Sequence, residues 1–412
     1  MAVPTINAVI NFSTGPSTAQ AMQLDIGLLG TNVLADAVAV IVDVSDKVNM
    51  VQTRIGRTAL SDQFQTGTMS LRIIDQNGDF NPTNPAGPYY GLLTPMKKVQ
   101  ITANYNSVTY PIFSGFITSY VNTQPKDATE VAYTTIQAVD AMRLAQNAQI
   151  STVIGASSGD LSGTRINEIL DEIDWPASMR QIDAGQTTLQ NDPGTPRTSL
   201  GAMQTVAQSE YGAIYAGFDG SFIFKDRLTA TASIGGTPTV FADDGTGIQY
   251  ANAAWKLDDT LIFNSAQISR AAGTVQSASN QASIDKYFIH SYNQQGLLMQ
   301  TDAVALDYAR AYVASRAETT IRCDAIELDL NTPNYDTGIL AALNLDFFDP
   351  ITVITTQPGG SKLEKTLQIF GVQNTITPNS FKVVFTTLEP VIDGFILGNV
   401  DYGVLDQNVL SY

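Results

Sequence analysis

The sequence predicts a mainly β protein with an α+β insertion, and three observations lead to this fold class. Runs that alternate apolar with polar residues, such as Phe381–Thr386, recur in the early and late parts of the chain between turn residues. Helical periodicity is confined to three stretches. With 412 residues, the chain is long enough for two or three domains of about 100–200 residues each.

The first β region is predicted from an ordered series of strands and turns. Thr68–Ile74 alternates as a strand and precedes the Asn77-Gly78 pair, which strongly favours a two-residue hairpin. The segment 80–85 holds two prolines and cannot continue a central strand. We expect two further strands, at Val99–Tyr105 and Tyr110–Ile117, joined by a second hairpin.

Three amphipathic helices are predicted after these strands. The first covers about residues 165–173, with apolar residues at i, i+3, i+4 and i+7 and Thr164 as a cap. The second starts near Ser199, and the third covers residues 302–317 with Thr301 as its cap. Each apolar stripe has the width expected of a helix that packs on a sheet.

The positions of loop-forming residues predict how the chain is divided into domains. Gly-, Ser- and Pro-rich loops at 154–163 and 190–196 lie within a small α/β segment. Strands predicted at 348–354, 367–372 and 381–386 complete a second β region. We therefore expect an N-terminal β domain (1–149), an α/β insertion (150–228), a second β domain with one helix at about 302–317 (229–390), and a C-terminal arm (391–412) that reaches onto a neighbouring protein.

Composition favours an assembly component over a monomer with a polar exterior. Only 15% of the residues are charged, against about 25% in ordinary soluble domains, and interface cores are depleted in charge. The net charge of −17 disfavours binding to DNA phosphates or to an anionic membrane surface. We find no apolar run near the ~20 residues of a membrane span and no signal peptide at the first residues, so we expect assembly in a cytoplasm.

Acidic clusters are the main candidates for chemistry, and a structural interpretation is favoured for each. Asp75-x-Asn77-x-Asp79 begins like a calcium-binding EF-hand loop, but Phe80 and Ala86 stand where that loop needs Gly and Glu. A β-turn is therefore the better interpretation. Glu168, Asp171 and Glu172 lie on one predicted helix and could be glycosidase carboxylates or a solvent-exposed stripe. Asp243 and Asp244 could bind a cation or form an acidic turn.

Cysteine and histidine are too scarce for a disulfide framework or a metal cluster. Cys323 and His290 are the only residues of their types, and both lie in segments that read as buried strands. No glycine pattern matches a nucleotide-phosphate loop. We therefore expect no catalytic residue, no metal ligand and no cofactor.

Short motifs between residues 53 and 117 resemble a known family. They read R-I-G-R at 54–57, D-Q-N-G-D-F at 75–80, N-P at 84–85, Y-Y at 89–90 and F-S-G-F-I at 113–117. In this order they resemble the opening β domain of the tail-hub or minor tail proteins of long-tailed bacteriophages. The family's later motifs are matched at 138–145, 174–176, 182–187, 209–212 and 219–227, so the resemblance covers roughly residues 35 to 330. Ile55 departs from the family, in which many members have glycine there.

The resemblance implies a set of structural residues. They are Asn77, Gly78, Phe80, Pro82, Asn84, Pro85, Tyr89, Tyr90, Phe113, Gly115 and Phe116. We expect Phe80, Tyr89 and Tyr90 to pack the Pro/Asn loop against the first sheet, because each aromatic side chain can bury about 150–250 Å².

The resemblance also implies a fold and a function. The fold would contain two β-barrel-like hub domains flanking the α/β segment. The protein would be a non-enzymatic structural subunit of the virion tail tip, a ring that joins the tail tube to receptor-binding or baseplate proteins and lines or closes the DNA exit path. Its partners would be further copies of itself, the distal tail protein, the tape-measure protein and receptor-binding tail proteins, with DNA only as passing cargo.

The copy number and the rival functions stay open at this point. Hubs of this kind form three-fold rings in which two β domains per subunit match a hexameric tube, so a homotrimer is expected and a hexamer is the alternative. We expect the acidic side chains to line the bore. A distal tail protein, a tail-associated cell-wall hydrolase and a carbohydrate-binding module of the tip are the alternative functions.

Overall fold

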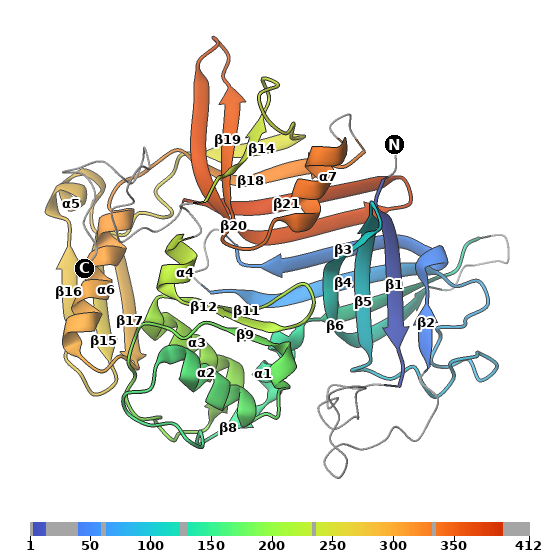
Figure 1. Cartoon of the computed structure of the whole chain (residues 1–412), viewed down its shortest axis with the longest axis horizontal. Coiled ribbons are helices and arrows are strands. Elements are labelled where there is room, and N and C mark those ends of the chain that lie inside the picture. Colours follow the sequence, from blue (N-terminus) through green and yellow to red (C-terminus); the bar gives the residue numbers. More distant parts are fainter. Residues whose placement is uncertain are drawn as a thin grey trace.

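The computed structural model describes residues 3–13, 40–58, 63–123, 130–232, 236–331 and 335–389. Within these ranges the mainly β class is confirmed, because the dominant feature is a 13-stranded sheet that draws strands from both predicted β regions (Figure 1). The predicted C-terminal arm at 391–412 lies outside the described residues.

The first part of the large sheet comes from the N-terminal residues. Its strand order is β3-β4-β7-β6-β5-β1-β2, and all neighbouring strands in it are antiparallel. The strands are β1 (Thr5–Asn11), β2 (Ile41–Asp43), β3 (Val48–Gly56), β4 (Gln65–Ile74), β5 (Lys98–Tyr105), β6 (Val108–Thr123) and β7 (Tyr133–Val139). A short 3₁₀ helix at Ser45–Lys47 precedes β3.

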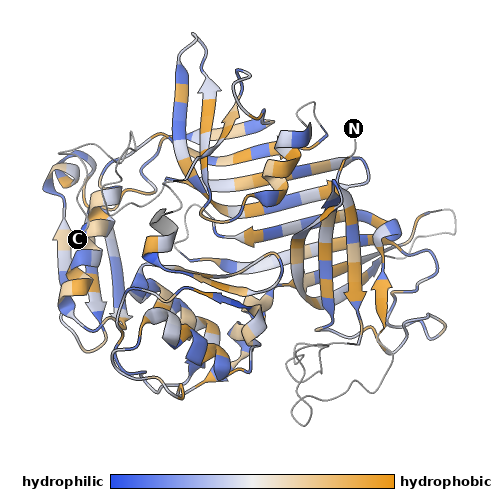
Figure 2. Ribbon diagram, in the orientation of Figure 1, coloured by the Kyte–Doolittle hydropathy of each residue, from blue (hydrophilic) through white to orange (hydrophobic). Residues whose placement is uncertain are grey.

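The second part of the sheet comes from the C-terminal residues. Its order is β14-β18-β21-β20-β19-β13, and the pairing of β20 with β3 joins it to the first part. The strands are β13 (Thr239–Ala242), β14 (Asn252–Lys256), β18 (Arg322–Asp329), β19 (Pro350–Thr356), β20 (Lys362–Thr377) and β21 (Ser380–Leu388). Figure 2 shows apolar and polar residues alternating along many of these strands, as expected of strands with one buried face.

The chain between β7 and β13 forms the α/β insertion. Helices α2 and α3 pack together beside a small sheet in which β12 pairs with β11 and β9. The elements are α1 (Ala141–Asn147), β8 (Gln149–Ile150), α2 (Ser162–Asp171), β9 (Arg180–Ile182), β10 (Arg197–Thr198), α3 (Ser199–Glu210), β11 (Ala213–Ala216), β12 (Phe222–Lys225) and α4 (Arg227–Ala232), with a 3₁₀ turn at Ala177–Met179.

A second small unit interrupts the chain between β14 and β18. Helix α6 packs on a three-stranded sheet, and together they enclose a separate hydrophobic core around Tyr312. The elements are β15 (Ser265–Arg270), β16 (Gln276–Ser279), α5 (Gln281–Tyr287), β17 (Ser291–Leu297) and α6 (Asp302–Arg316). Helix α7 (Tyr335–Asn344) follows β18.

The three predicted helices are confirmed as α2, α3 and α6. Thr301 caps α6 as predicted, but α2 begins earlier than expected, after Leu161 rather than Thr164. The prediction of one helix in residues 229–390 is wrong, because α5 and α7 lie there as well. Helix α5 also replaces part of the strand predicted around His290, and β17 starts only at Ser291.

Candidate functional site

The loop between β4 and β5 is organised by one buried carboxylate. Asp75 accepts hydrogen bonds from the backbone N–H groups of Asp79 (2.7 Å) and Phe80 (3.1 Å) and from the Thr134 hydroxyl (2.7 Å). The loop then continues as a series of turns. In each turn a backbone N–H donates to the backbone carbonyl oxygen three residues earlier. The turns end at Gly78, Asn81, Asn84, Gly87 and Tyr90. Backbone and side-chain bonds together therefore hold this loop in one conformation.

This loop does not form the hairpin predicted at Asn77-Gly78. Strands β4 and β5 are not neighbours, because β7 and β6 lie between them in the sheet. Gly78 does adopt the left-handed conformation expected of it, with φ of 67°. Asn84 donates to the carbonyl oxygen of Gly78 at 3.0 Å, so the turn is used to build a crossing loop. The prediction is wrong because the Asp75 carboxylate captures the two N–H groups after the turn.

The aromatic residues of the loop are divided between core and surface. Phe80 is fully buried, and its ring centroid lies 5.0 Å from that of Tyr89, which stacks on Phe12 at 5.3 Å. Tyr90 is 55% exposed, so the prediction that it packs against the first sheet is wrong. Among the motif's prolines, Pro82 is half-buried and Pro85 is exposed.

The remaining motif residues lie in β6, where the strand changes partners. Phe116 pairs with Lys98 of β5 on one edge and with Val139 of β7 on the other. Phe113 and Phe116 are both buried. A Cβ on Gly115 would stand 2.3 Å from the carbonyl oxygen of Val139, so a side chain at this position requires the strands to move. The motif therefore lies where the long strand β6 stops pairing with β5 and starts pairing with β7.

The same bent-strand arrangement occurs twice in the chain. In strand order, β3-β4-β7-β6-β5-β1 matches β14-β18-β21-β20-β19-β13, and we call these β-unit 1 and β-unit 2. The long strands β6 and β20 each carry a register shift at the same place, after Ile117 and after Ile369. The outermost strands differ, because β1 is antiparallel to β5 whereas β13 is parallel to β19.

Backbone hydrogen bonds support the equivalence of the two β-units. Met96 and Phe348 both have positive φ, 66° and 71°, and each lies two residues before the start of its strand, β5 or β19. Each donates its N–H to the residue before the register shift, Met96 to Ile117 at 2.6 Å and Phe348 to Ile369 at 2.8 Å. The repeat therefore extends to an uncommon backbone conformation for residues with side chains.

The two β-units meet where β3 pairs with β20. The ladder runs from Val51 opposite Ile376 to Gly56 opposite Gly371. Gly56 has φ of 109°, and a Cβ there would lie 2.5 Å from the Cα of Gly371, so glycine allows the closest approach at this end. The buried Asn374 amide donates to Thr53 at 3.0 Å and satisfies both polar groups. We call this ladder the internal junction.

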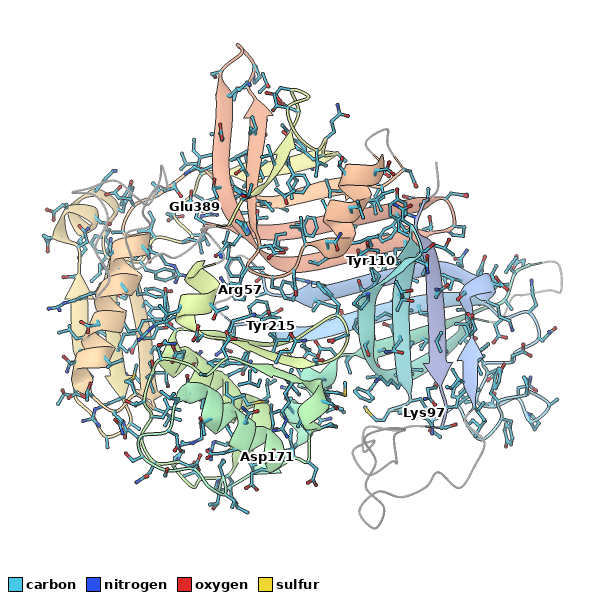
Figure 3. All side chains as sticks on the ribbon, viewed as in Figure 1. Arg57, Lys97, Tyr110, Asp171, Tyr215 and Glu389 are labelled. Atoms are coloured by element: carbon cyan, nitrogen blue, oxygen red, sulfur yellow. The ribbon has the colours of Figure 1, made fainter. Side chains whose placement is uncertain are left out.

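An aromatic cluster fixes the α/β insertion to the internal junction. Tyr215 of the insertion lies between Phe64 of the β3–β4 loop and Phe347 before β19, at centroid distances of 4.7 and 5.1 Å. The Arg57 guanidinium lies over the ring of Phe370, 4.0 Å from its centroid. Figure 3 shows Arg57 and Tyr215 near each other where the insertion meets the large sheet. Three segments that are distant in sequence therefore share one packed core.

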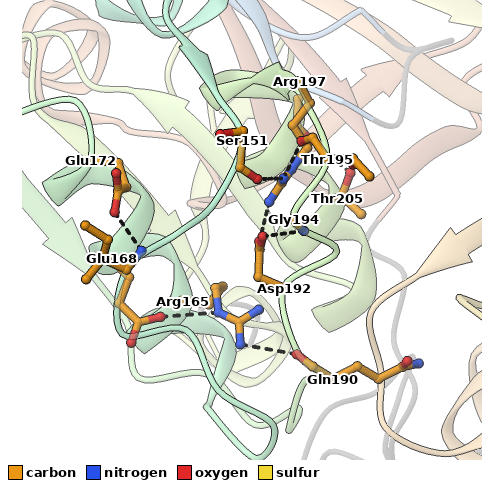
Figure 4. Close-up of polar contacts among 12 residues, drawn as sticks. Ser151, Arg165, Glu168, Glu172, Gln190, Asp192, Gly194, Thr195, Arg197 and Thr205 are labelled. Atoms are coloured by element: carbon orange, nitrogen blue, oxygen red, sulfur yellow. Dashed lines mark hydrogen bonds and ion pairs between the residues drawn. The ribbon is translucent and has the colours of Figure 1, made fainter.

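The helical carboxylates are tied into structural contacts. Arg165 of α2 is fully buried and pairs with Asp160 at 2.8 Å. It also pairs with Glu168 at 3.2 Å and donates to the carbonyl oxygen of Gln190 (Figure 4). Burial raises the pKa of Glu168. Asp171 pairs with Arg180 at 2.7 Å. These contacts fasten the loops at 154–163 and 190–196 to α2.

Glu172 has a separate structural contact, in which it accepts the backbone N–H of Ile154 at 2.6 Å (Figure 4). The acidic turn is bonded in the same way, because Asp243 accepts from the Thr356 N–H at 2.8 Å and Asp244 pairs with Lys362 at 2.6 Å. Within the described ranges, no group of three or more His, Cys, Asp or Glu side chains could hold a metal ion.

Cys323 and Asp140 are buried titratable groups. Cys323 lies in β18 as predicted, and burial raises the pKa of its thiol to about 11, which disfavours the thiolate. Asp140 caps α1 by accepting from the Met142 N–H at 3.0 Å, and it also accepts from the Gly67 N–H at 2.6 Å. Burial raises the pKa of Asp140 to about 7.

No helix in the described part of the chain is long and apolar enough to cross a membrane. No protein-family model and no curated protein matches the sequence. Solved structures do match. The 43 kDa tail protein of prophage MuSo2 from Shewanella oneidensis aligns with a TM-score of 0.51 at 11% identity, over 85% of this chain and 96% of that one.

A tail protein from Neisseria meningitidis MC58 aligns similarly, with a TM-score of 0.52 at 10% identity over 83% of this chain and 96% of the other. Both alignments span most of the two β-units and the insertion together. The chain therefore shares the fold of these two tail proteins.

Proposed function

We propose that this chain is a structural subunit of a phage tail tip, of the hub type. In this role, copies of the chain form a ring that joins the tail tube to receptor-binding or baseplate proteins and lines or closes the DNA exit path. The observation that carries the proposal is the fusion of two equivalent β-units into one sheet through the internal junction. Because each copy contributes two equivalent β-units, a ring contains twice as many β-units as copies of the chain.

The copy number follows from matching this duplication to a tube of six-fold symmetry. A homotrimer supplies six β-units in one ring, whereas a hexamer would supply twelve. Closed rings built from one head-to-tail contact are a common outcome of such surfaces. The homotrimer is therefore the assembly we propose, with the tube on one face and receptor-binding proteins on the other.

The packing suits a subunit that carries mechanical load. The aromatic cluster and the internal junction hold both β-units and the insertion as one body. Buried Arg165 fastens the longest loops of the insertion to α2. The role is non-enzymatic and uses no cofactor, and the carboxylates considered for catalysis serve structural contacts instead.

The partners of the ring are proposed from its position. They are the distal tail protein, the tape-measure protein and the receptor-binding tail proteins. DNA passes through the ring as cargo. The net charge of −17 per chain suits a wall that repels phosphates and does not bind them.

Two measurements test this proposal. Antibody-gold labelling of intact virions should place the chain at the tail end far from the capsid, and light scattering on the purified chain should give the mass of three copies. Label along the whole tube would contradict a tip position. A stable six-copy ring would favour a distal tail protein.

A further inference from the structure

We propose that neighbouring copies join by pairing β14 of one chain with the C-terminal half of β6 in the next chain. This contact between copies would repeat the internal junction of β3 with β20, and the inference rests on the proposed ring. The occupant of each strand edge is thus a second copy of this chain, and the sheet continues from one subunit into the next.

The first observation is that each β-unit leaves half of this junction unfilled. In the described part of the chain, β14 pairs with β18 alone, and β6 beyond Ile117 pairs with β7 alone. Their counterparts β3 and β20 pair with each other. One chain therefore carries both halves of the same contact, at opposite ends of its pair of units, which is the arrangement required for head-to-tail assembly.

The repeat also fixes the register of the proposed pairing. After the register shifts, Tyr120 lies opposite Ile136 as Val372 lies opposite Phe385, so Tyr120 occupies the position of Val372. On the other side, Ala253 and Val51 occupy matching positions, because they pair with matching residues of β18 and β4.

Leu257 lies four residues after Ala253, and Ile55 lies four residues after Val51, so Leu257 occupies the position of Ile55. In the internal junction Val372 is opposite Ile55. The proposed junction therefore sets Tyr120 opposite Leu257, and Val121 opposite Lys256.

Exposure of apolar side chains is the second, independent observation. Ile55 and Val372, which lie opposite each other in the internal junction, belong to the hydrophobic core and are only 4% and 5% exposed. Leu257, in the position of Ile55, is 61% exposed. Exposed apolar residues on an unpaired strand edge are a known liability unless another strand covers them. Pairing with a second copy gives both strand edges a partner and covers Leu257.

The register shift within β14 is compatible with pairing. The shift lies between Ala254 and Trp255 on the side that faces β18. Strand β3 has a similar shift between Arg54 and Gly56 and nevertheless pairs with β20 along its other edge. Added strands of this kind gain affinity from main-chain hydrogen bonds and specificity from alternate side chains, here Tyr120 and Leu257.

Cysteine cross-linking tests the pairing and its register together. Full-length chains carrying Val121→Cys are mixed with full-length chains carrying Lys256→Cys and oxidised, because directly opposite residues bring Cβ atoms within reach of a disulfide. The native Cys323 is fully buried and does not compete. We expect a covalent dimer from the mixture and much less from either variant alone.

Two matched controls define the expected behaviour. Arg54→Cys with Gln373→Cys in one chain occupies the equivalent, exposed pair of the internal junction and should cross-link within the chain. Val121→Cys mixed with Asn252→Cys is displaced by four residues, or about 13 Å along a strand, and should not cross-link. Equal cross-linking at Asn252 and Lys256 would overturn the proposed register.

A second variant separates failure of this inference from failure of the proposed function. Leu257→Ser should lower the assembled mass of the parent chain to that of a monomer in light scattering without a change in melting temperature. The control Ile154→Ser, at a side chain that is 79% exposed in the insertion, should leave assembly intact.

The outcomes are distinct. Rings that form normally with Leu257→Ser and give no Val121–Lys256 cross-link would overturn the pairing and leave the ring proposal standing. A parent chain that stays monomeric in solution and is absent from virion tails would overturn both. Cross-linking of the Lys256→Cys edge to a different tail protein in purified virions, in place of a second copy, would also overturn the inference.

Discussion

The two β-units share a framework but differ in the connection that crosses each of them. In β-unit 1, residue 75 is a buried aspartate, and in β-unit 2 the equivalent residue is the buried Leu330. Both donate their N–H groups across the sheet at 2.9 Å, Asp75 to Ala132 and Leu330 to Phe381.

The chain continues differently after Asp75 and after Leu330. The Asp75 carboxylate gathers N–H groups and starts the turn loop, whereas Leu330 packs in the core and the chain continues towards helix α7. Strand register is retained in both units, while the connection that follows the strand differs. The two β-units therefore differ in the connections that follow β4 and β18.

The largest expected effect is on the core of the β-unit 1 loop. Phe80→Ala should lower the free energy of unfolding by about 3–5 kcal/mol, because Phe80 is fully buried among aromatic rings. Urea denaturation measures the change. Tyr90→Ala is the matched control at an exposed aromatic residue, and it should stay within about 0.5 kcal/mol of the parent. Equal effects of the two substitutions would contradict the division between core and surface.

Replacing Asp75 by the leucine that β-unit 2 has at this position tests the role of the carboxylate. Asp75→Leu should destabilise the chain by about 1–3 kcal/mol, because it leaves the N–H groups of Asp79 and Phe80 without their acceptor. The reverse exchange, Leu330→Asp, should also destabilise, because the buried carboxylate there would lack those donors. A stable Asp75→Leu chain with unchanged hydrogen-exchange protection in residues 75–90 would show that the carboxylate does not organise the loop.

A smaller effect concerns pH and the cap of α1. Because burial raises the pKa of Asp140 to about 7, from 3.8, the folded chain holds a proton that the unfolded chain has lost between these values. The stability contributed by this group is full at low pH and is lost as the pH rises through about 7, with a slope of at most ~1.4 kcal/mol per pH unit.

Urea denaturation at about pH 5 and about pH 8 measures this dependence. Asp140→Asn retains a capping side chain and removes the titration, so its loss of stability between the two pH values should be smaller than that of the parent. An identical loss in both chains would assign the pH dependence to other groups.

The smallest expected effect is on cell-wall hydrolysis. The parent chain should release no muropeptides from purified peptidoglycan, and Asp171→Asn should not alter that baseline, since Asp171 pairs with Arg180 in a structural contact. Activity in the parent that is lost in this variant would overturn the non-enzymatic assignment.

Local patterns in the sequence predicted much of the fold. The strand predicted at Val99–Tyr105 matches β5, and the turn before Phe381 joins β20 to β21 as alternation and turn residues indicated. The amphipathic stripes found α2, α3 and α6. Short helices such as α1 and α5 have too few turns to show a clear stripe, although the cap residues Asp140 and Asn280 were available as signals.

Features that depend on distant residues were not predicted. The Asn77-Gly78 pair indicated a hairpin, but the bond from Thr134 to Asp75 and the insertion of β6 and β7 between β4 and β5 belong to tertiary structure. The repeat of the β-units was also hidden, because equivalent positions hold residues as different as Asp75 and Leu330. The two β-units resemble each other in strand register and backbone conformation, and not in amino-acid sequence.

A cryo-EM reconstruction of the intact tail tip would show the copy number of the chain and the side chains that line the bore. We expect three copies in one closed ring, with six β-units around the bore and Asp and Glu side chains facing the lumen. A focused negative potential in such a narrow channel would repel passing phosphates. A ring of six identical copies, or a lumen lined by Lys and Arg, would contradict this expectation.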